Sequence, residues 1–197
     1  AASGTGLRGE YFTGVDFGPR LMARFDPVLN FKWNEAPPQE SLPRFRYSVR
    51  WTGFLEAPAT AKWRFETEAD DGVRLWIDGR LLFEKWETRR VSKDRGDIEL
   101  EAGKLHPFKL EFFQGLGDAE LRLFWNGPGR ERELVPTTQF YPPGLWPEGL
   151  VTRAGSFIAG RVALAAGGGA AVARNGRTLE LARGAVERFV FLEPTPD

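Results

Sequence analysis

Apolar and polar side chains alternate along most of this chain, and that period of two limits the folds open to it. In residues 61–67, Trp63 and Phe65 alternate with charged residues, and Leu75 and Ile77 flank an outward position a few residues later. Neighbouring side chains on a β-strand point to opposite faces of the sheet, so the alternation indicates strands with one buried and one wet face. Antiparallel sheets are commonly built in this way.

The alternation recurs at regular spacing, and turn sequences separate the apolar runs. Further runs occupy residues 47–55, 108–112 and 121–125, whereas Asp78-Gly79 and residues 101–104 predict tight turns. Residues 31–42 are rich in Asn, Pro and Glu and predict an irregular loop. We therefore expect an all-β fold, an antiparallel β-sandwich or barrel without long helices. The predicted core comprises Trp51, Trp63, Phe65, Leu75, Ile77, Leu110, Phe112 and Leu123.

Proline and glycine cluster at residues 141–147, where we expect a boundary between a first domain, residues 1–145, and a second module, residues 146–197. Beyond it Ala, Gly, Val and Arg dominate. About five short β segments follow, with a hairpin turn at Asn175-Gly176, which suggests a small SH3-like or Sm-like β-barrel. The alternative is an extension that packs on the first domain.

Composition excludes several functional classes. The 27 Lys and Arg residues balance 27 Asp and Glu residues, which argues against a general electrostatic grip on nucleic acid. No apolar run reaches the ~18–20 residues of a membrane span. The absence of Cys removes thiol catalysis and thiolate metal sites. The single histidine, His106, precedes Pro107 at the start of a predicted strand, where a structural role is the better interpretation.

The sharpest local feature is Asp70-Asp71, a pair of adjacent carboxylates between two predicted strands. A cis peptide between them would bring both carboxylates to one hard cation, because it shortens the Cα–Cα step to about 2.9 Å. Without metal the two charges repel, so we expect one carboxyl pKa to rise. The alternative is a surface turn, for which Asp-Asp-Gly is good chemistry. The loop from Gln114 to Ala119 is also rich in oxygen and would complete a cation shell if the fold brings the two loops together.

Residues 6 to about 141 resemble the protective-antigen-fourteen (PA-fourteen) domain family, the β-sandwich of adhesins, glycosidase accessory domains and toxins. The resemblance rests on GLRGEYF at 6–12, FRYSVRWTGFL at 45–55, WRFETEADDGVRLWIDG at 63–79 and the order of later stretches up to AELRLFW at 119–125. Several lectin-like members bind calcium through a cis Asp–Asp pair, and the ion then coordinates vicinal sugar hydroxyls. The resemblance implies a calcium ligand set of Asp70, Asp71, Gln114, Gly115, Asp118 and Ala119.

The leading hypothesis is therefore a calcium-dependent, lectin-like carbohydrate-binding module that is not an enzyme. We expect it to act outside the cytoplasm of a bacterium, at the cell surface or in the periplasm, and to bind a glycan or other subunits of a surface assembly. The alternative is a structural or protein-interaction β-sandwich without sugar binding, and a glycosidase is a third hypothesis. Trp33, Trp76 and Trp86 could be sugar-stacking platforms or core residues. The basic stretch 85–95 suggests a solvated loop.

Overall fold

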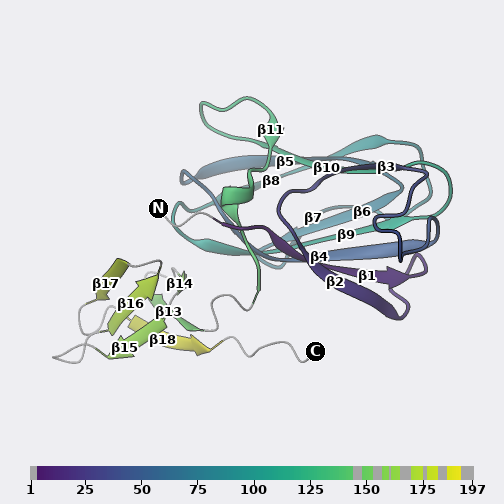
Figure 1. The fold of residues 1–197 in the computed structure, drawn as a ribbon. Helices are drawn as coiled ribbons and strands as arrows, with labels where there is room; N and C mark the ends of the chain where they lie inside the picture. Colours follow the sequence, from purple (N-terminus) through teal and green to yellow (C-terminus); the bar gives the residue numbers. More distant parts are fainter. Residues whose placement is uncertain are drawn as a thin grey trace.

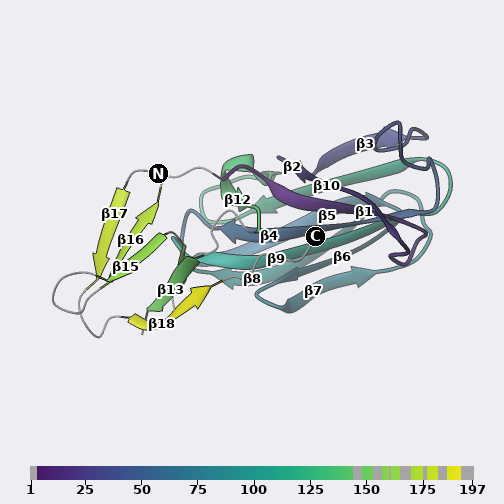
Figure 2. The ribbon, with the colours of Figure 1, turned by 60° about the horizontal axis from the view of Figure 1, so that its bottom comes forward.

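The first 140 or so residues of this computed structural model form a β-sandwich, with two sheets lying face to face (Figures 1 and 2). The structure describes residues 4–143 in full and, beyond them, the backbone of the strands β13 to β18. Strands account for the regular structure of residues 4–143 apart from one short 3-10 helix, Thr137–Gln139. The expected antiparallel β-sandwich is therefore confirmed.

The larger sheet has seven strands and runs in the order β2-β1-β4-β9-β6-β7, with β12 added beside β4. All of its pairings are antiparallel. Its strands are β1 (Leu7–Thr13), β2 (Arg20–Asp26), β4 (Tyr47–Glu56), β6 (Gly72–Ile77), β7 (Arg80–Lys85), β9 (Leu105–Gln114) and β12 (Phe140–Tyr141).

The smaller sheet has five strands and runs in the order β11-β10-β5-β8, with β3 paired to β10. Its strands are β3 (Asn30–Asn34), β5 (Ala61–Asp70), β8 (Ser92–Leu100), β10 (Ala119–Asn126) and β11 (Glu133–Leu134). The irregular loop expected for residues 31–42 is wrong for residues 31–34, which belong to strand β3, whereas residues 35–42 lie outside any strand. In β3, Phe31 and Trp33 turn toward the core, while Asn30, Lys32 and Asn34 are exposed.

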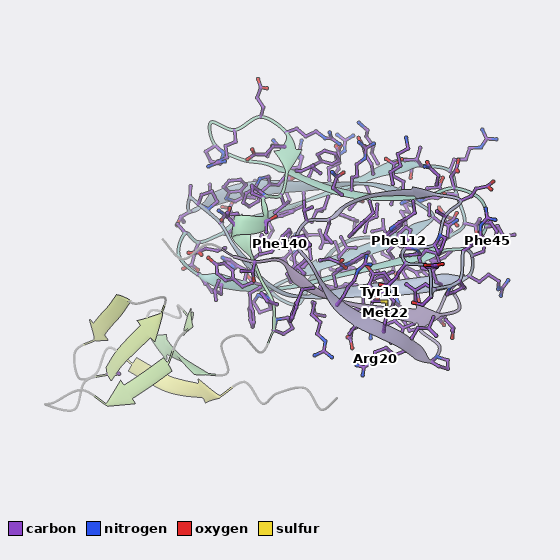
Figure 3. All side chains as sticks on the ribbon, viewed as in Figure 1. Tyr11, Arg20, Met22, Phe45, Phe112 and Phe140 are labelled. Carbon is purple, nitrogen blue, oxygen red and sulfur yellow. The ribbon has the colours of Figure 1, made fainter. Side chains whose placement is uncertain are left out.

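The core fills the space between the two sheets. All eight residues predicted for it are buried, with at most 1% of their surface exposed. Phe112 and Phe140, labelled in Figure 3, lie among the side chains packed between the sheets. Trp51 also donates an indole hydrogen bond to the buried carboxylate of Asp26 (2.7 Å). Burial of these large rings supplies most of the apolar contact area that holds the sheets together.

Two connections cross between the sheets at neighbouring positions. Strand β5 of the small sheet passes into β6 of the large sheet through Asp70-Asp71, and β9 of the large sheet passes into β10 of the small sheet through residues 115–118. The strands on each side are paired directly, Asp70 with Glu120 and Gly72 with Phe113. The two oxygen-rich segments are therefore neighbours at one end of the sandwich.

Beyond residue 143, six strands form two further three-stranded antiparallel sheets, β14-β13-β18 and β15-β16-β17. They are β13 (Glu148–Thr152), β14 (Phe157–Ala159), β15 (Arg161–Leu164), β16 (Ala170–Arg174), β17 (Arg177–Leu181) and β18 (Val186–Phe191). The expected β segments are present, one more than the five anticipated. The turn at Asn175-Gly176 and residues 144–147 of the expected boundary lie outside the described residues, and the SH3-like barrel and the division at residue 145 stay predictions. The described residues include no helix with the length and apolar character of a membrane crossing.

Candidate metal centre

The Asp70-Asp71 corner has the backbone form expected from the sequence, because its peptide bond is cis. The glycine that follows is required by packing. A Cβ atom on Gly72 would lie 2.1 Å from Cε1 of the Phe113 ring, so no larger residue fits there without movement. Gly72 thus lets strand β6 approach β9 closely enough to carry Asp71 to the 115–118 loop.

Asp71 is buried, and its carboxylate joins two loops. The backbone N–H of Arg89 donates to Oδ1 and the backbone N–H of Gly115 donates to Oδ2, both at 2.8 Å. The Arg89 guanidinium also donates to the Asp71 carbonyl oxygen (3.1 Å) and pairs with Asp94. A carboxylate offers about four lone-pair sites. Asp71 therefore keeps acceptor capacity while it holds both loops in place.

Asp70 is only half-buried, and its surroundings are negative. Burial raises the pKa of the Asp70 carboxyl to about 6, and the charge of Asp71 adds to the rise. Asp118 and Glu120 raise it further, while a backbone hydrogen bond from Val91 opposes the shift. These charges agree with the expected rise of one carboxyl pKa. A cation at this position would relieve the repulsion.

Gln114 contributes a buried acceptor beside these carboxylates. Its amide nitrogen donates to the carbonyl oxygen of Gly117 (3.1 Å). Its amide oxygen, by contrast, has no hydrogen-bond partner within the described part of the chain, although the side chain is fully buried. Buried polar atoms are nearly always paired. An orphaned amide oxygen next to two carboxylates suits a hard cation, which prefers oxygen ligands.

The other three predicted ligands lie along the same loop. The Gly115 carbonyl already accepts from the backbone N–H of Arg46 (3.0 Å), and Ala119 is buried at the start of β10. Asp118 is exposed and close enough to Asp70 to shift its pKa. In the stretch that the structure describes, no three carboxylate or imidazole side chains are grouped to hold a metal by themselves. A calcium ion here would therefore use amide and carbonyl oxygens as well as carboxylates, and the donor set fits that requirement.

A groove of about 360 Å³ adjoins the corner. It is lined by Val15, Arg46, Trp86, Glu87, Thr88, Phe113, Gly115 and Leu116. A Cβ on Gly115 would lie 3.1 Å from Asp71 Oδ2 and 3.5 Å from Thr88 Oγ1, so only this glycine separates Asp71 from the groove wall. Leu116 is 68% exposed, which leaves an apolar surface beside the charged corner.

The three tryptophans considered as sugar platforms have different surroundings. Trp33 stacks on Phe31 and packs against the core. Trp76 is half-buried on the other face of its sheet, with the Lys109 ammonium 3.9 Å from its ring centroid. Trp86 is the one that lines the groove, where Phe17 stacks on it and Arg74 lies 4.1 Å from its ring.

Sequence reasoning missed several residues of this site. The prediction of a solvated loop for residues 85–95 is wrong at Arg89, which is largely buried and whose backbone N–H donates to Asp71. Glu120 adds to the negative potential at Asp70. The Arg122 guanidinium donates a hydrogen bond to the Glu120 carboxylate. Only the pairing of β5 with β10 places Glu120 beside Asp70, so no local pattern marks it. His106, by contrast, has the expected structural role, bonding Asp78 (2.7 Å) and the backbone N–H of Glu101 (3.1 Å).

Comparison with known proteins shows which proteins share this architecture. The anti-sigma-I factor RsgI3 of Acetivibrio thermocellus is 41% identical over 140 residues, which cover 71% of this chain but only 22% of that protein. A solved anti-sigma factor domain-containing protein is 40% identical with a TM-score of 0.69, covering 75% of this chain and 52% of its own. The PA14 sugar-binding domain of an RTX adhesin shares the fold, with a TM-score of 0.57 at 18% identity, covering 71% of this chain and 99% of its own. The family model of the PA14 domain matches residues 3–139, so the chain belongs to the PA14 domain family.

Proposed function

We propose that this chain is a calcium-dependent carbohydrate-binding module. The observation that carries the proposal is the meeting of the half-exposed Asp70, the buried Asp71 and the unpaired amide oxygen of Gln114 beside an open groove. The carbohydrate-binding name of the similar RTX adhesin domain supports it.

The roles of the residues follow from their chemistry. Asp70 and Asp71 would supply the anionic oxygens, Gln114 the buried neutral oxygen, and Asp118 with the carbonyl groups of Gly115 and Ala119 the remainder of a six- to eight-oxygen shell. When bound, calcium supplies coordination positions that vicinal hydroxyls of a sugar can take in place of water. The chain itself contributes a corner held open by the Asp71 hydrogen bonds to Arg89 and Gly115.

The part of the sugar that does not coordinate calcium would lie in the groove. Apolar and aromatic side chains suit the C–H faces of sugar rings, and Trp86 and Leu116 supply both kinds of surface next to Asp71. Hydroxyl oxygens are weak ligands. We therefore expect a dissociation constant in the millimolar to high micromolar range for a single sugar, corresponding to about 4–6 kcal/mol. Several copies on one surface would then be needed for firm attachment.

A module of this kind would act outside the cytoplasm, where calcium is abundant, and would bind its glycan without catalysing a reaction. A second function is favoured by a specific observation, since each Asp71 oxygen already accepts a hydrogen bond from a backbone N–H. The corner is therefore held without metal, as a structural or protein-interaction sandwich would need. The anti-sigma factor relatives, of which the chain spans only a part, suit such a role within a larger protein.

Calorimetry on metal-stripped protein separates the two functions. We expect calcium to bind first, and a panel of hexoses and pentoses to give heat only when calcium is present. Asp70→Asn should abolish both signals, whereas Asp97→Asn should change neither, because Asp97 lies on the surface with Arg64 and Lys62. Calcium binding that survives Asp70→Asn, or sugar binding that survives chelation, would contradict the mechanism. Absence of calcium binding in the unmodified protein would favour the structural module.

A further inference from the structure

Tyr47 lies in the same cross-strand row as two of the proposed calcium ligands. On strand β4 it is paired directly with Gln114 of β9. On the other side of β9, Gly72 pairs with Phe113, so one further step along this register sets Asp71 opposite Gln114. Directly opposed residues of an antiparallel pair have Cβ atoms about 4.5–5.5 Å apart. The row Tyr47, Gln114, Asp71 thus runs from β4 across β9 to the residue that precedes β6, at the end of the sheet.

The Tyr47 hydroxyl is buried and has no hydrogen-bond partner among the described residues. The side chain is 1% exposed, and its ring is fixed by edge-on contact with Trp33 and a tilted contact with Phe112. A buried hydroxyl without a partner costs about 1–3 kcal/mol. A phenylalanine would fill the same space without that cost, so packing alone does not explain a tyrosine here.

The other two residues of this row carry acceptors that the calcium site would use. The Gln114 amide oxygen lacks a partner, as the Tyr47 hydroxyl does. Burial raises the pKa of the Tyr47 hydroxyl and the charge of Asp71 adds to the rise, so the hydroxyl stays protonated as a donor. Asp71 uses two of its lone-pair sites on backbone N–H groups and has capacity for a further donor.

We propose that Tyr47 is a positioning residue of the calcium site, its hydroxyl donating to the Asp71 carboxylate from the interior of the sandwich when the metal is bound. The inference rests on the proposed calcium function. The hydrogen bond orients Asp71 toward the ion and leaves the Gln114 oxygen free for coordination. Partners of this kind behind metal ligands typically change metal affinity 10- to 100-fold when removed.

Tyr47→Phe tests the proposal through two readouts, calcium affinity by calorimetry and thermal melting in a chelator. We expect the calcium dissociation constant to rise about 10- to 100-fold. We also expect the metal-free variant to melt at or above the temperature of the unmodified protein, because an unpaired buried hydroxyl has been removed. Thr67→Val is the matched control. Its hydroxyl is likewise buried without a partner among the described residues, but it lies farther along β5, so calcium affinity should not change.

The outcomes are distinguishable from those of the proposed function. Calcium binding by the unmodified protein with an affinity unchanged by Tyr47→Phe would overturn the role of Tyr47 while leaving the calcium site intact. A lower melting temperature of the metal-free Tyr47→Phe variant would also overturn it, because the hydroxyl would then be needed for folding. An equal loss of affinity in Thr67→Val would show a general effect of the core instead.

Discussion

At the scale of single residues, the two adjacent aspartates have different structural roles. Asp71 is buried and bonds two loops, whereas Asp70 is half-buried and accepts a backbone hydrogen bond from Val91. Asp71→Asn would place an amide N–H₂ group against a backbone N–H donor. We therefore expect the metal-free protein to lose about 1–3 kcal/mol of unfolding free energy.

Denaturant melts in a chelator measure this loss, with Asp70→Asn as the matched control. Asp70→Asn removes a repelled charge and should not reduce stability. If the two variants melt alike, Asp71 does not hold the loops. The same contrast explains why Asp70→Asn is the cleaner test of calcium binding, since it leaves the bonds to Arg89 and Gly115 in place.

The raised pKa of Asp70 predicts a pH dependence of the metal-free protein. Burial and the charge of Asp71 raise the pKa of the Asp70 carboxyl to about 6 in the folded chain, above its ordinary value of 3.8. The folded state therefore holds the proton more tightly, and this contribution to stability is full below pH 3.8 and is lost as the pH rises through 6. In a chelator, we expect the contribution of Asp70 to raise the melting temperature as the pH falls from 7 to 5.

Comparison with Asp70→Asn isolates that contribution, because the variant has no carboxyl to titrate at this position. The difference in melting temperature between the two proteins should narrow as the pH falls through this window. Calcium should reverse the trend in the unmodified protein, since metal and proton compete for the same oxygens. A difference that stays constant from pH 7 to pH 5 would contradict the assigned shift.

At the scale of elements, the contact between β6 and β9 fixes the metal centre. Gly72→Ala would place a methyl group 2.1 Å from Cε1 of the Phe113 ring, so either this ring or β6, together with Asp71, must move. Overpacking of this kind costs about 1–3 kcal/mol. We expect a destabilised variant with weaker calcium binding, measured by denaturant melts and calorimetry.

Phe113→Leu supplies the partner for a double-mutant cycle, because a smaller side chain leaves room for the added methyl group. Gly72→Ala should cost less stability in the Phe113→Leu background than in the unmodified protein. Additive effects would show that something other than the Phe113 ring requires the glycine.

Most of the sandwich was predictable because apolar and polar residues alternate along many of its strands. In the runs around Trp63, Leu75 and Leu110, the positions of the apolar residues indicate which face of each strand is buried. Asp78-Gly79 is a hairpin turn with positive φ at both residues. Strand β3 was missed since its two inward aromatics stand among Asn, Pro and Glu, and its pairing with β10 supplies the order that the local sequence does not. Local propensity is overridden there by pairing and burial.

The candidate site was predictable only in part. Asp70-Asp71 and the Gln114–Ala119 loop stand out by composition, and the family resemblance joins them. Glu120 and Tyr47 are set beside the aspartates only by the register of β4, β5, β9 and β10, and Arg89 reaches Asp71 from the connection between β7 and β8. A one-residue change in register would turn these side chains to the opposite face, so their roles depend on long-range pairing.

At the scale of the whole molecule, the strands of the sandwich are complete before residue 143, and its two ends are hydrogen-bonded to each other. The N-terminal segment is hydrogen-bonded to the 3-10 helix and to the last strand, with the N–H of Gly4 donating to the Thr138 carbonyl and that of Gly6 to the Phe140 carbonyl. Strand β12 then pairs with β4 at the centre of the large sheet. Among the side chains that the structure describes, the buried residues of the main hydrophobic cluster fall between Leu7 and Phe140.

This closure predicts that residues 1–143 fold without the remainder of the chain. A domain of this size buries roughly 68–70% of its unfolded surface, enough for an independent core. We expect the shortened protein to melt in one cooperative transition and to bind calcium with the affinity of the full chain, because every proposed ligand and the bonds around Asp71 lie within it. Loss of cooperative melting would show that residues 144–197 complete the fold of the sandwich. Cooperative melting with altered calcium affinity would instead show that the C-terminal strands act on the site, and the boundary near residue 145 would then separate two coupled units.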